Sequence, residues 1–342
     1  MRAVVLTLLT LLAASLAHAE HSSADVRYRL EQLPHRPGID DRAGSVGINS
    51  RGAIAGHFVS SPVFLWTARG RVIEAETTDP TLQRLEARGM NDRDQVVGFS
   101  TFEDVDTILT THGFVWTSGR VIDMGDLPGG ANASFATDIN NRGVVVGSSY
   151  TELGRRAVLW EHGNLEVIGP SGFDTVAIND RGTVVGMLFG VGAVTWREGE
   201  MRVLPGQSPY TACCLAVDIN NRGTVVGIFS NQTVTQTIVW PRGHMPRFLP
   251  NLSGSEYSLP EGLNDRGDIV GYSAQAGGAV ATLWRRGAAA QNLNDLISDD
   301  DQLKGCAVLV GAIAINNRGE IAANGRDDCD FTGGHVYRLI PL

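Results

Sequence analysis

The sequence predicts an all-β protein, a seven-bladed β-propeller with four-stranded blades. A hairpin motif typified by "INNRGVVVG" (139–147) recurs seven times, and an apolar strand containing tryptophan recurs six times between the hairpins. The leading asparagines of the hairpins lie roughly 44.5 residues apart on average, a period typical of propeller blades. Each period holds four short strands and shows no helical periodicity, which favours a closed ring of blades.

The hairpin motif predicts a type I turn followed by a residue in the left-handed region. Asn at the first position bonds its own backbone in an Asx-turn, and Gly at the last adopts a positive φ without steric cost. We interpret the leading asparagines as structural turn residues: Asn49, Asn91, Asn140, Asn179, Asn220, Asn264 and Asn316. In the second copy Asp94 stands in the glycine position, so the sequence predicts that Asp94→Gly stabilises the protein.

The tryptophans share one position in the strand that precedes the next tight turn. They are Trp66, Trp116, Trp160, Trp196, Trp240 and Trp284, and Tyr337 takes the aromatic position in the seventh repeat. A carbohydrate-stacking surface is one interpretation of six tryptophans. Their identical strand position favours a core between the blades, because aromatic side chains carry large buried areas.

The last aromatic strand, 335–340, reaches the end of the sequence without a following partner strand. The segment "VRYRLEQLPHRPG" (26–38) aligns with "VIDMGDLPGG" (121–130), which follows a tryptophan strand elsewhere. We therefore expect the N-terminal strand to complete the last blade, so that the ring presents no open sheet edge. Residues 20–342 then form a single propeller domain.

The first nineteen residues read as a signal peptide. Arg2 precedes an apolar run, and Ala17-His18-Ala19 fits the small-x-small cleavage pattern. We expect a secreted or periplasmic protein without a membrane span, acting as a monomer. The formal net charge of −9 lacks the basic footprint of nucleic-acid binding, so we expect no nucleic-acid partner.

The two ends of the predicted ring differ. The tight turns, such as 140–143, all fall at one end, which we call the turn face. The connections that vary in length and composition, such as 125–134 and 250–258, fall at the other end, the variable face. Because function concentrates in loops held by a rigid scaffold, we expect a ligand on the variable face around the central channel.

No catalytic, cofactor-binding or metal-binding residue is predicted. Acidic clusters at 103–106, 299–301 and 327–330 offer oxygen ligands for Ca²⁺, but none has the spacing of a known calcium loop, and solvated charge is the favoured interpretation. The turn arginines present a basic ring that an anionic polymer could use, but solvated turn residues in an acidic protein are the favoured interpretation. They are Arg51, Arg93, Arg142, Arg181, Arg222, Arg266 and Arg318.

The cysteines allow a sharper prediction. Cys306 and Cys329 lie almost symmetrically about the last hairpin turn, so the hairpin register brings them opposite each other to within about one residue. In an exported protein this predicts a Cys306–Cys329 disulfide that fastens the final blade. Adjacent Cys213 and Cys214 form either a vicinal disulfide or two packed thiols.

The tryptophan strand, the "DMGDLPGG" segment (123–130) and "INNRGVVVG" together resemble the HAF repeat family of extracellular bacterial repeat proteins. The resemblance covers essentially the whole chain after the signal peptide and implies a propeller-like β structure. It implies no common activity and no catalytic residues. The sequence departs from the pattern at Asp94, at Tyr337 and in the last hairpin, where "EIAANG" (320–325) replaces the usual strand.

Three functions fit these observations. The first is an exported binding module whose variable face holds an extracellular polysaccharide or a protein. The second is a secreted hydrolase or lyase with a site assembled from several blades, and the third is a structural component of a cell surface or matrix.

Overall fold

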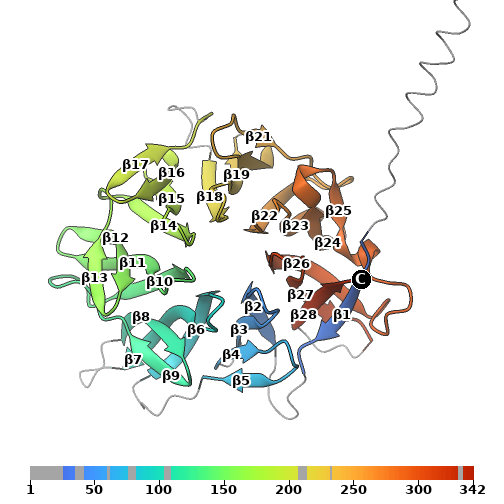
Figure 1. Cartoon of the computed structure of the whole chain (residues 1–342), viewed down its shortest axis with the longest axis horizontal. Helices are drawn as coiled ribbons and strands as arrows, with labels where there is room; N and C mark the ends of the chain where they lie inside the picture. Colours follow the sequence, from blue (N-terminus) through green and yellow to red (C-terminus); the bar gives the residue numbers. More distant parts are fainter. Residues whose placement is uncertain are drawn as a thin grey trace, which may run out of the picture.

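The structure, a computed structural model, describes residues 26–34, 42–59, 62–75, 82–103, 109–206, 214–231, 233–329 and 334–342. These residues form seven four-stranded antiparallel sheets arranged as blades around a central opening (Figure 1). The predicted seven-bladed propeller is confirmed. The expected signal peptide, residues 1–19, lies outside the described residues.

Blades are numbered along the chain, and the strands of each blade are given from the channel outward. Blade 1 contains β2 (Ala43–Ile48), β3 (Ile54–Phe58), β4 (Val63–Trp66) and β5 (Val72–Glu74). Blade 2 contains β6 (Leu82–Met90), β7 (Val96–Glu103), β8 (Leu109–Thr117) and β9 (Arg120–Asp123). Blade 3 contains β10 (Ser134–Ile139), β11 (Val145–Thr151), β12 (Gly154–Glu161) and β13 (Asn164–Val167). Blade 4 contains β14 (Phe173–Ile178), β15 (Val184–Leu188), β16 (Gly192–Arg197) and β17 (Glu200–Val203).

Blade 5 contains β18 (Cys214–Ile219), β19 (Val225–Ser230), β20 (Thr235–Trp240) and β21 (Arg247–Phe248). Blade 6 contains β22 (Tyr257–Leu263), β23 (Ile269–Gln275), β24 (Gly278–Trp284) and β25 (Ala290–Asn292), with the short 3-10 helices η1 (Arg285–Gly287) and η2 (Leu293–Leu296). Blade 7 contains β26 (Ala307–Ile315), β27 (Ile321–Asp327), β28 (His335–Pro341) and β1 (Tyr28–Gln32). In the part of the chain that the structure describes, no helix is long and apolar enough to cross a membrane.

Each innermost strand contains a bulge near the turn face. In blade 3, β10 pairs with β11 from Ser134↔Ser149 to Ile139↔Val145, and the register shifts between Ala136 and Asp138. Corresponding shifts occur in the innermost pairs of the other six blades. A bulge re-aims the side chains beside it, and here both Thr137 and Asp138 line the channel.

The glycine that ends each "VVG" segment lets two strands approach closely. A Cβ on Gly147 in β11 would lie 1.9 Å from the carbonyl oxygen of Phe135 in β10. The corresponding glycine is equally crowded by the innermost strand in every blade, with clashes of 1.8 to 2.4 Å: Gly56, Gly98, Gly186, Gly227, Gly271 and Gly325. The recurring glycine is therefore required by space rather than by a positive φ.

The hydrophobic core lies between neighbouring blades. In the cluster between blades 5 and 6, Trp284 packs with Val239 and Leu249 of blade 5 and Ile269 of its own blade. The tryptophans of blades 1, 2, 5 and 6 are buried, and those of blades 3 and 4, Trp160 and Trp196, are partly buried against similar clusters. The four buried tryptophans thus lie in the packing between blades, and Trp160 and Trp196 pack there with part of their surface exposed.

The aromatic position of blade 7 is a correction to the sequence analysis. Every tryptophan stands opposite the first residue of its neighbouring strand, as in Val145↔Trp160. In blade 7 this register position is Ile321↔Leu339, so Leu339 and not Tyr337 takes the tryptophan position. Tyr337 stands two residues earlier and is buried, and its hydroxyl donates to the carbonyl of Arg326 at 3.2 Å. No tight turn follows β28, and the sequence therefore contained no marker that fixed this register.

Blade 7 combines the two ends of the described chain. β1 pairs antiparallel with β28 from Tyr28↔Pro341 to Gln32↔Tyr337 and is the outermost strand of the blade. The outer edge of β1 is covered by the segment that leads into blade 7, because Ser298 N–H donates to Tyr28 O at 2.9 Å. The backbone N–H of Leu30 donates to Asp301 Oδ2 at 2.7 Å in the same segment.

A buried arginine joins β1, β28 and blade 1. Arg338 in β28 is 2% exposed, and its guanidinium pairs with Glu31 in β1. It also donates to the carbonyls of Gly52 at 2.8 Å and Thr67 at 3.1 Å, and its Cζ lies 4.6 Å from the ring centroid of Trp66. The charge is therefore compensated by an anion, two carbonyl dipoles and an aromatic face.

Candidate functional site

The seven asparagine turns meet at the turn-face mouth of the channel, which forms a cavity of about 210 Å³. The side chain of each leading asparagine builds its own turn. Asn140 Oδ1 accepts from the backbone N–H of Arg142 at 3.0 Å and of Val144 at 3.1 Å. The same two bonds occur in all seven turns. This is the Asx-turn geometry that the motif predicts.

The same asparagines also link neighbouring blades. In six of the seven, Nδ2 donates to the backbone carbonyl of the leading asparagine in the next blade, at 2.9 to 3.1 Å. The last of these bonds runs from Asn316 in blade 7 to Asn49 in blade 1. The exception is Asn49, whose Nδ2 donates instead to the carboxylate of Asp94 in the turn of blade 2 at 2.6 Å.

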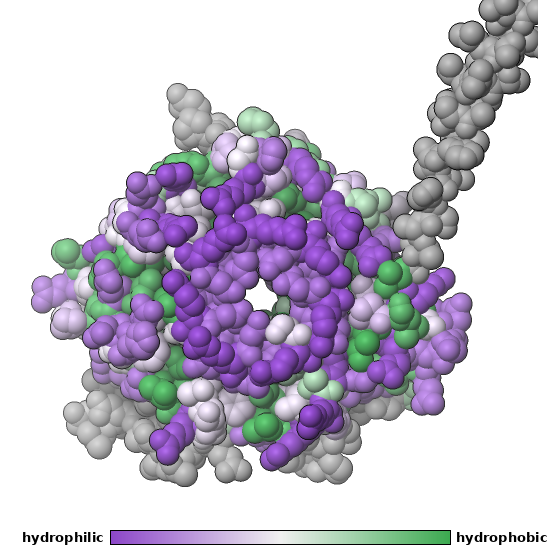
Figure 2. All heavy atoms as spheres, in the orientation of Figure 1, coloured by the Kyte–Doolittle hydropathy of each residue, from purple (hydrophilic) through white to green (hydrophobic). Residues whose placement is uncertain are grey.

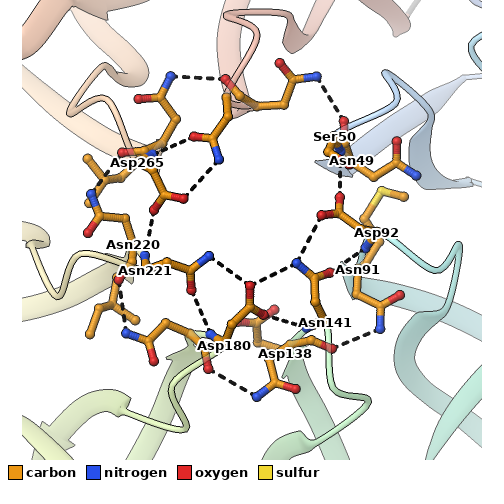
Figure 3. Close-up of a pocket in the computed structure, with 18 of the residues that line it drawn as sticks. Asn49, Ser50, Asn91, Asp92, Asp138, Asn141, Asp180, Asn220, Asn221 and Asp265 are labelled. Atoms are coloured by element: carbon orange, nitrogen blue, oxygen red, sulfur yellow. Dashed lines mark hydrogen bonds between the residues drawn. The ribbon is translucent and has the colours of Figure 1, made fainter.

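A second ring of side chains lies beside the first (Figure 3). Its members follow the leading asparagines in sequence: Ser50, Asp92, Asn141, Asp180, Asn221, Asp265 and Asn317. Six of their backbone N–H groups donate to the side-chain oxygen of the next member at 2.6 to 2.8 Å. The sequence analysis did not find this ring, although the residues stand one position after each predicted turn asparagine.

Aspartate and asparagine alternate around the second ring, so that amides face carboxylates. Asn141 Nδ2 donates to Asp92 at 3.0 Å and to Asp180 at 3.1 Å, and Asn221 Nδ2 donates to Asp180 at 2.9 Å. Alternation cannot close in a ring of seven, and Ser50 stands where two like residues would otherwise meet. The polar atoms of this mouth bond to one another, which indicates a structural seal between the blades.

Two carboxylates lie deeper in the channel. Asp138 accepts from its neighbour Ile139 at 2.8 Å and from Ile178 of the next blade at 2.8 Å. Asp218 makes the corresponding bonds with Ile219 and Leu263, both at 2.7 Å. Enclosure in the channel raises the pKa of Asp138 to about 7 and that of Asp218 to about 6, because desolvation disfavours the charged form. Both side chains bridge blades through the backbone.

The turn arginines differ in their partners around the ring. In blades 1, 6 and 7 they pair with carboxylates: Arg51 with Asp94, Arg266 with Asp268 and Arg318 with Glu320. Among the described residues, the four arginines of blades 2 to 5 have no carboxylate partner: Arg93, Arg142, Arg181 and Arg222. Hydrophilic residues encircle the central opening (Figure 2).

The variable face presents apolar side chains at hairpin tips. Leu153 lies between β11 and β12, and Phe189 lies at the same connection between β15 and β16. They are 84% and 83% exposed. Val59 and Val234 occupy the corresponding connections of blades 1 and 5 and are also exposed. Other parts of this face, including 104–108 and 207–213, lie outside the described residues.

A histidine clasp joins blades 2 and 3 on the same face. His112 Nδ1 lies 3.0 Å from Asp123 Oδ2, and its Nε2 lies 3.3 Å from Asn132 Oδ1. Both partners are acceptors, so the arrangement suits an imidazolium that donates from both nitrogens. The bond with Asp123 accordingly raises the pKa of His112. With both nitrogens engaged, this pair is arranged for holding the connection rather than for general base catalysis.

The predicted disulfide is confirmed: Cys306 and Cys329 are bonded, with their Cα atoms 5.1 Å apart. Within the described residues, the only group of side chains close enough to share a metal contains these two bonded cysteines and Asp327. Cys214 is buried at the start of β18, and Cys213 lies outside the described residues.

The described carboxylates of the acidic clusters bond to neighbouring groups of the chain. Asp299 pairs with Lys304 at 3.1 Å, whereas Asp300 accepts from Ser298. Asp301 accepts from the backbone of Leu30 and of Leu303. Of the 327–330 cluster, Asp327 accepts from Cys329 N–H and Asp328 pairs with Arg326, and residue 330 lies outside the described residues. Most of the 103–106 cluster also lies outside them.

No protein-family model and no curated protein matches the chain. Solved propellers match it in structure. A streptogramin B lyase superposes with a TM-score of 0.56 at 12% identity, covering 92% of this chain and 98% of that chain. Virginiamycin B lyase from Staphylococcus aureus gives 0.57 at 10% identity, with 92% and 100% covered. YCF48 bound to a D1 peptide gives 0.53 at 12% identity, with 92% and 97% covered. At these identities the likeness shows the fold alone.

Proposed function

We propose that this protein is a binding module that holds a protein partner on the variable face of the ring. The observation that carries the proposal is the exposure of Leu153 and Phe189, 84% and 83%, at the same hairpin tip in adjacent blades. Removing one such side chain from water on binding contributes about 1.5 to 3 kcal/mol. Large apolar residues gathered on one face mark interaction surfaces more often than scattered ones do.

The turn face supports the same choice by contrast. Its asparagines and aspartates are engaged with one another and with the backbone, as in the bonds of Asn141 to Asp92 and Asp180. A ligand at that mouth would compete with bonds that hold the blades together. The variable face has no such shared pattern, because its connections differ from blade to blade.

The structural neighbours are compatible with this choice without deciding it. YCF48 is a propeller solved with a bound peptide, and two other neighbours are lyases. An extracellular polysaccharide remains the alternative ligand, and a secreted lyase or hydrolase the alternative activity. Three of the four exposed tips, Leu153, Val59 and Val234, are aliphatic and favour a protein over a sugar, since sugars are recognised chiefly by aromatic faces and hydrogen bonds; Phe189 suits either ligand.

We also propose that the chain is exported after cleavage near Ala19 and belongs to the HAF repeat proteins. The apolar N-terminal run and the small-x-small site support export. The seven hairpin motifs with their tryptophan strands support the family. Mass spectrometry of the secreted protein tests the first point, because the proposal expects an N-terminus at Glu20.

The binding proposal is tested with biotinylated protein, residues 20–342, incubated with the secreted and surface proteins of the cell that produces it. Retained proteins are crosslinked and quantified for the wild type and for Leu153→Ser/Phe189→Ser. The control is Met245→Ser/Leu342→Ser, which removes two exposed apolar side chains at the turn-face ends of β20 and β28. Chemical change in the retained molecules and in added polysaccharides is recorded in the same samples.

We expect a saturable partner that the wild type and the control retain equally. The variable-face variant should weaken retention about tenfold or more, since a loss of about 1.4 kcal/mol is a factor of ten. Equal retention by all three proteins would place the interface elsewhere. Product formation would replace the binding module with the lyase or hydrolase.

A further inference from the structure

We propose that the groove between blades 4 and 5 binds an acidic peptide segment of a partner protein. The groove has a volume of about 840 Å³ and opens beside the turn face. One wall comes from β16, β17 and the turn between them, and the other from the end of β20 and the turn that follows it. It is separate from the apolar hairpin tips of the variable face.

More guanidinium groups than carboxylates line the groove. Its four arginines are Arg181, Arg197, Arg202 and Arg242, and its two carboxylates are Glu198 and Glu200. The carboxylates are already paired, Arg197 with Glu198 at 3.1 Å and Arg202 with Glu200 at 2.9 Å. Within the described part of the chain, Arg181 and Arg242 have no carboxylate partner. The groove therefore offers two uncompensated positive charges in a protein of net charge −9.

The sequence explains why Arg181 is unpaired. Two residues after the turn arginine, blades 6 and 7 carry Asp268 and Glu320, and each pairs with the arginine of its own turn. Blade 4 carries Thr183 at that position. The blade 4 arginine is consequently exposed at the groove without a neutralising neighbour in its own turn.

The side chain of Arg242 packs against Gly223, where the absence of a Cβ leaves room for it. A Cβ on Gly223 would lie 3.1 Å from Arg242 Cδ, so the arginine stem packs directly over the turn of blade 5. Packing of the stem restricts the side chain before a ligand arrives, which lowers the entropy lost on binding. An arginine fixed in this way can receive a carboxylate through two parallel hydrogen bonds.

The apolar part of the groove favours a peptide over an acidic polysaccharide. Trp240 is 2% exposed, and its Nε1 donates to Pro205 O at 2.9 Å, so its ring offers no stacking face to a sugar. Met245 at the rim is 76% exposed, and Pro241 lies beside it. A flexible methionine adapts to varied apolar side chains and is frequent on peptide-binding surfaces. Carboxylates with an interspersed apolar side chain match this lining.

The test uses a fluorescein-labelled peptide of alternating glutamate and alanine. Fluorescence anisotropy is measured at low ionic strength with the full mature chain. Arg181→Gln/Arg242→Gln is compared with Arg69→Gln/Arg93→Gln, which removes two arginines from turns of blades 1 and 2 on the same face. A glutamine version of the peptide and an oligogalacturonate of similar length serve as the other probes.

We expect saturable binding of the glutamate peptide that the groove variant weakens about tenfold, because two charge-assisted contacts are lost. The control variant should change affinity less than about threefold, and the glutamine peptide should not bind. Equal weakening by both variants would mean a general field of the turn face and would overturn the groove. Tighter binding of the oligogalacturonate would overturn the peptide assignment, and absence of binding would reject the site.

This inference is independent of the variable-face partner. Leu153→Ser/Phe189→Ser should leave the affinity for the glutamate peptide unchanged, and Arg181→Gln/Arg242→Gln should leave the retention of the variable-face partner unchanged. Failure of either proposal is therefore visible without the other.

Discussion

At the residue scale, the side chain of each leading asparagine makes two kinds of hydrogen bond, one within its own turn and one to a neighbouring blade. Its oxygen closes its own turn, and its amide reaches the carbonyl of the next blade, as in Asn140 to Asn179 at 3.1 Å. An ionised aspartate has no hydrogen to donate to the next blade. A serine has one hydroxyl, which cannot both accept from two N–H groups of its own turn and reach the next blade. The motif therefore predicts the local turn, whereas the link between blades becomes visible only in the assembled ring.

The turn of blade 2 tests this logic. Asp94 has φ of 60°, a conformation that costs less for glycine, and it accepts from Asn49 and Arg51 of blade 1. In Asp94→Gly the amide of Asn49 can turn to the carbonyl of Asn91, as its six counterparts do. We expect a gain of up to about 1 kcal/mol from the backbone, less the small contribution of an exposed ion pair.

Asp94→Ala separates the two effects, because it keeps the strained φ and removes both acceptors. We expect Asp94→Gly to unfold at or above the wild-type denaturant midpoint and Asp94→Ala below it. Equal midpoints for the two variants would show that the left-handed conformation carries no cost at this turn.

The carboxyl of Asp138 predicts a pH dependence. Its pKa in the folded protein is about 7, above the ordinary value of 3.8, so the folded state favours the neutral form. The associated stability is complete below about pH 4 and is lost as the pH rises to about 7. The difference in unfolding free energy between the wild type and Asp138→Asn should shift against the wild type by about 1 kcal/mol or more over this range.

Thermal unfolding of both proteins between these pH values measures the effect. The charge of Asp218 also raises the pKa of Asp138, so the same comparison is repeated with Asp218→Asn present in both proteins. A difference that stays constant with pH would mean that channel water keeps the Asp138 carboxylate solvated.

At the element scale, the close approach of the two inner strands depends on glycine. A Cβ on Gly147 meets the carbonyl oxygen of Phe135, whereas one on Gly277 meets nothing within 4 Å. We expect Gly147→Ala to reduce the free energy of unfolding by about 2 kcal/mol or more, because the strands must separate. Gly277→Ala should stay within about 0.5 kcal/mol of the wild type. Similar urea midpoints for the two variants would contradict the packing argument.

The positions of the strands were largely predictable because the same sequence pattern recurs in each repeat. The turn asparagine and the tryptophan strand together locate three of the four strands in blades 1 to 6. The bulge that turns Asp138 toward the channel has no distinct local pattern, because Gly47, Gly89 and Ala177 occupy the same position in other blades. The register of β28 was misplaced by two residues for lack of a following turn.

At the scale of the whole molecule, Arg338 connects β28 and β1 with blade 1. Arg338→Met leaves Glu31 and the carbonyls of Gly52 and Thr67 without this donor, and we expect a loss of about 3 kcal/mol or more. Arg326→Met, which removes an exposed pair with Asp328 in the same blade, should cost less than about 1 kcal/mol. Chemical denaturation of both variants measures this. Equal losses would show that Arg338 has no special part in joining the ends of the chain.

The division of the ring into two faces was predictable in part. Uniform turn lengths placed the seven hairpins on one face, and variable connections placed the individual loops on the other. The residues of the alternating ring, such as Asp92 and Asn141, can be read from the sequence. Their contacts form only when the blades assemble, because the ring brings together residues roughly 40 to 50 positions apart. The arginine groove depends likewise on two blades, and no local motif marks it.

The central claim is that the turn-face mouth of the channel is a closed hydrogen-bonded structure, so that recognition falls to surfaces outside this mouth. Hydrogen–deuterium exchange of the whole chain tests it most directly, because protection reports the free energy of local opening. We predict that the turn amides, such as Val144 N–H bonded to Asn140, exchange in all seven blades nearly as slowly as the central strands, while the exposed tip amides of Glu152 and Leu153 exchange fast. Turn amides that exchange as fast as those tips would contradict the account.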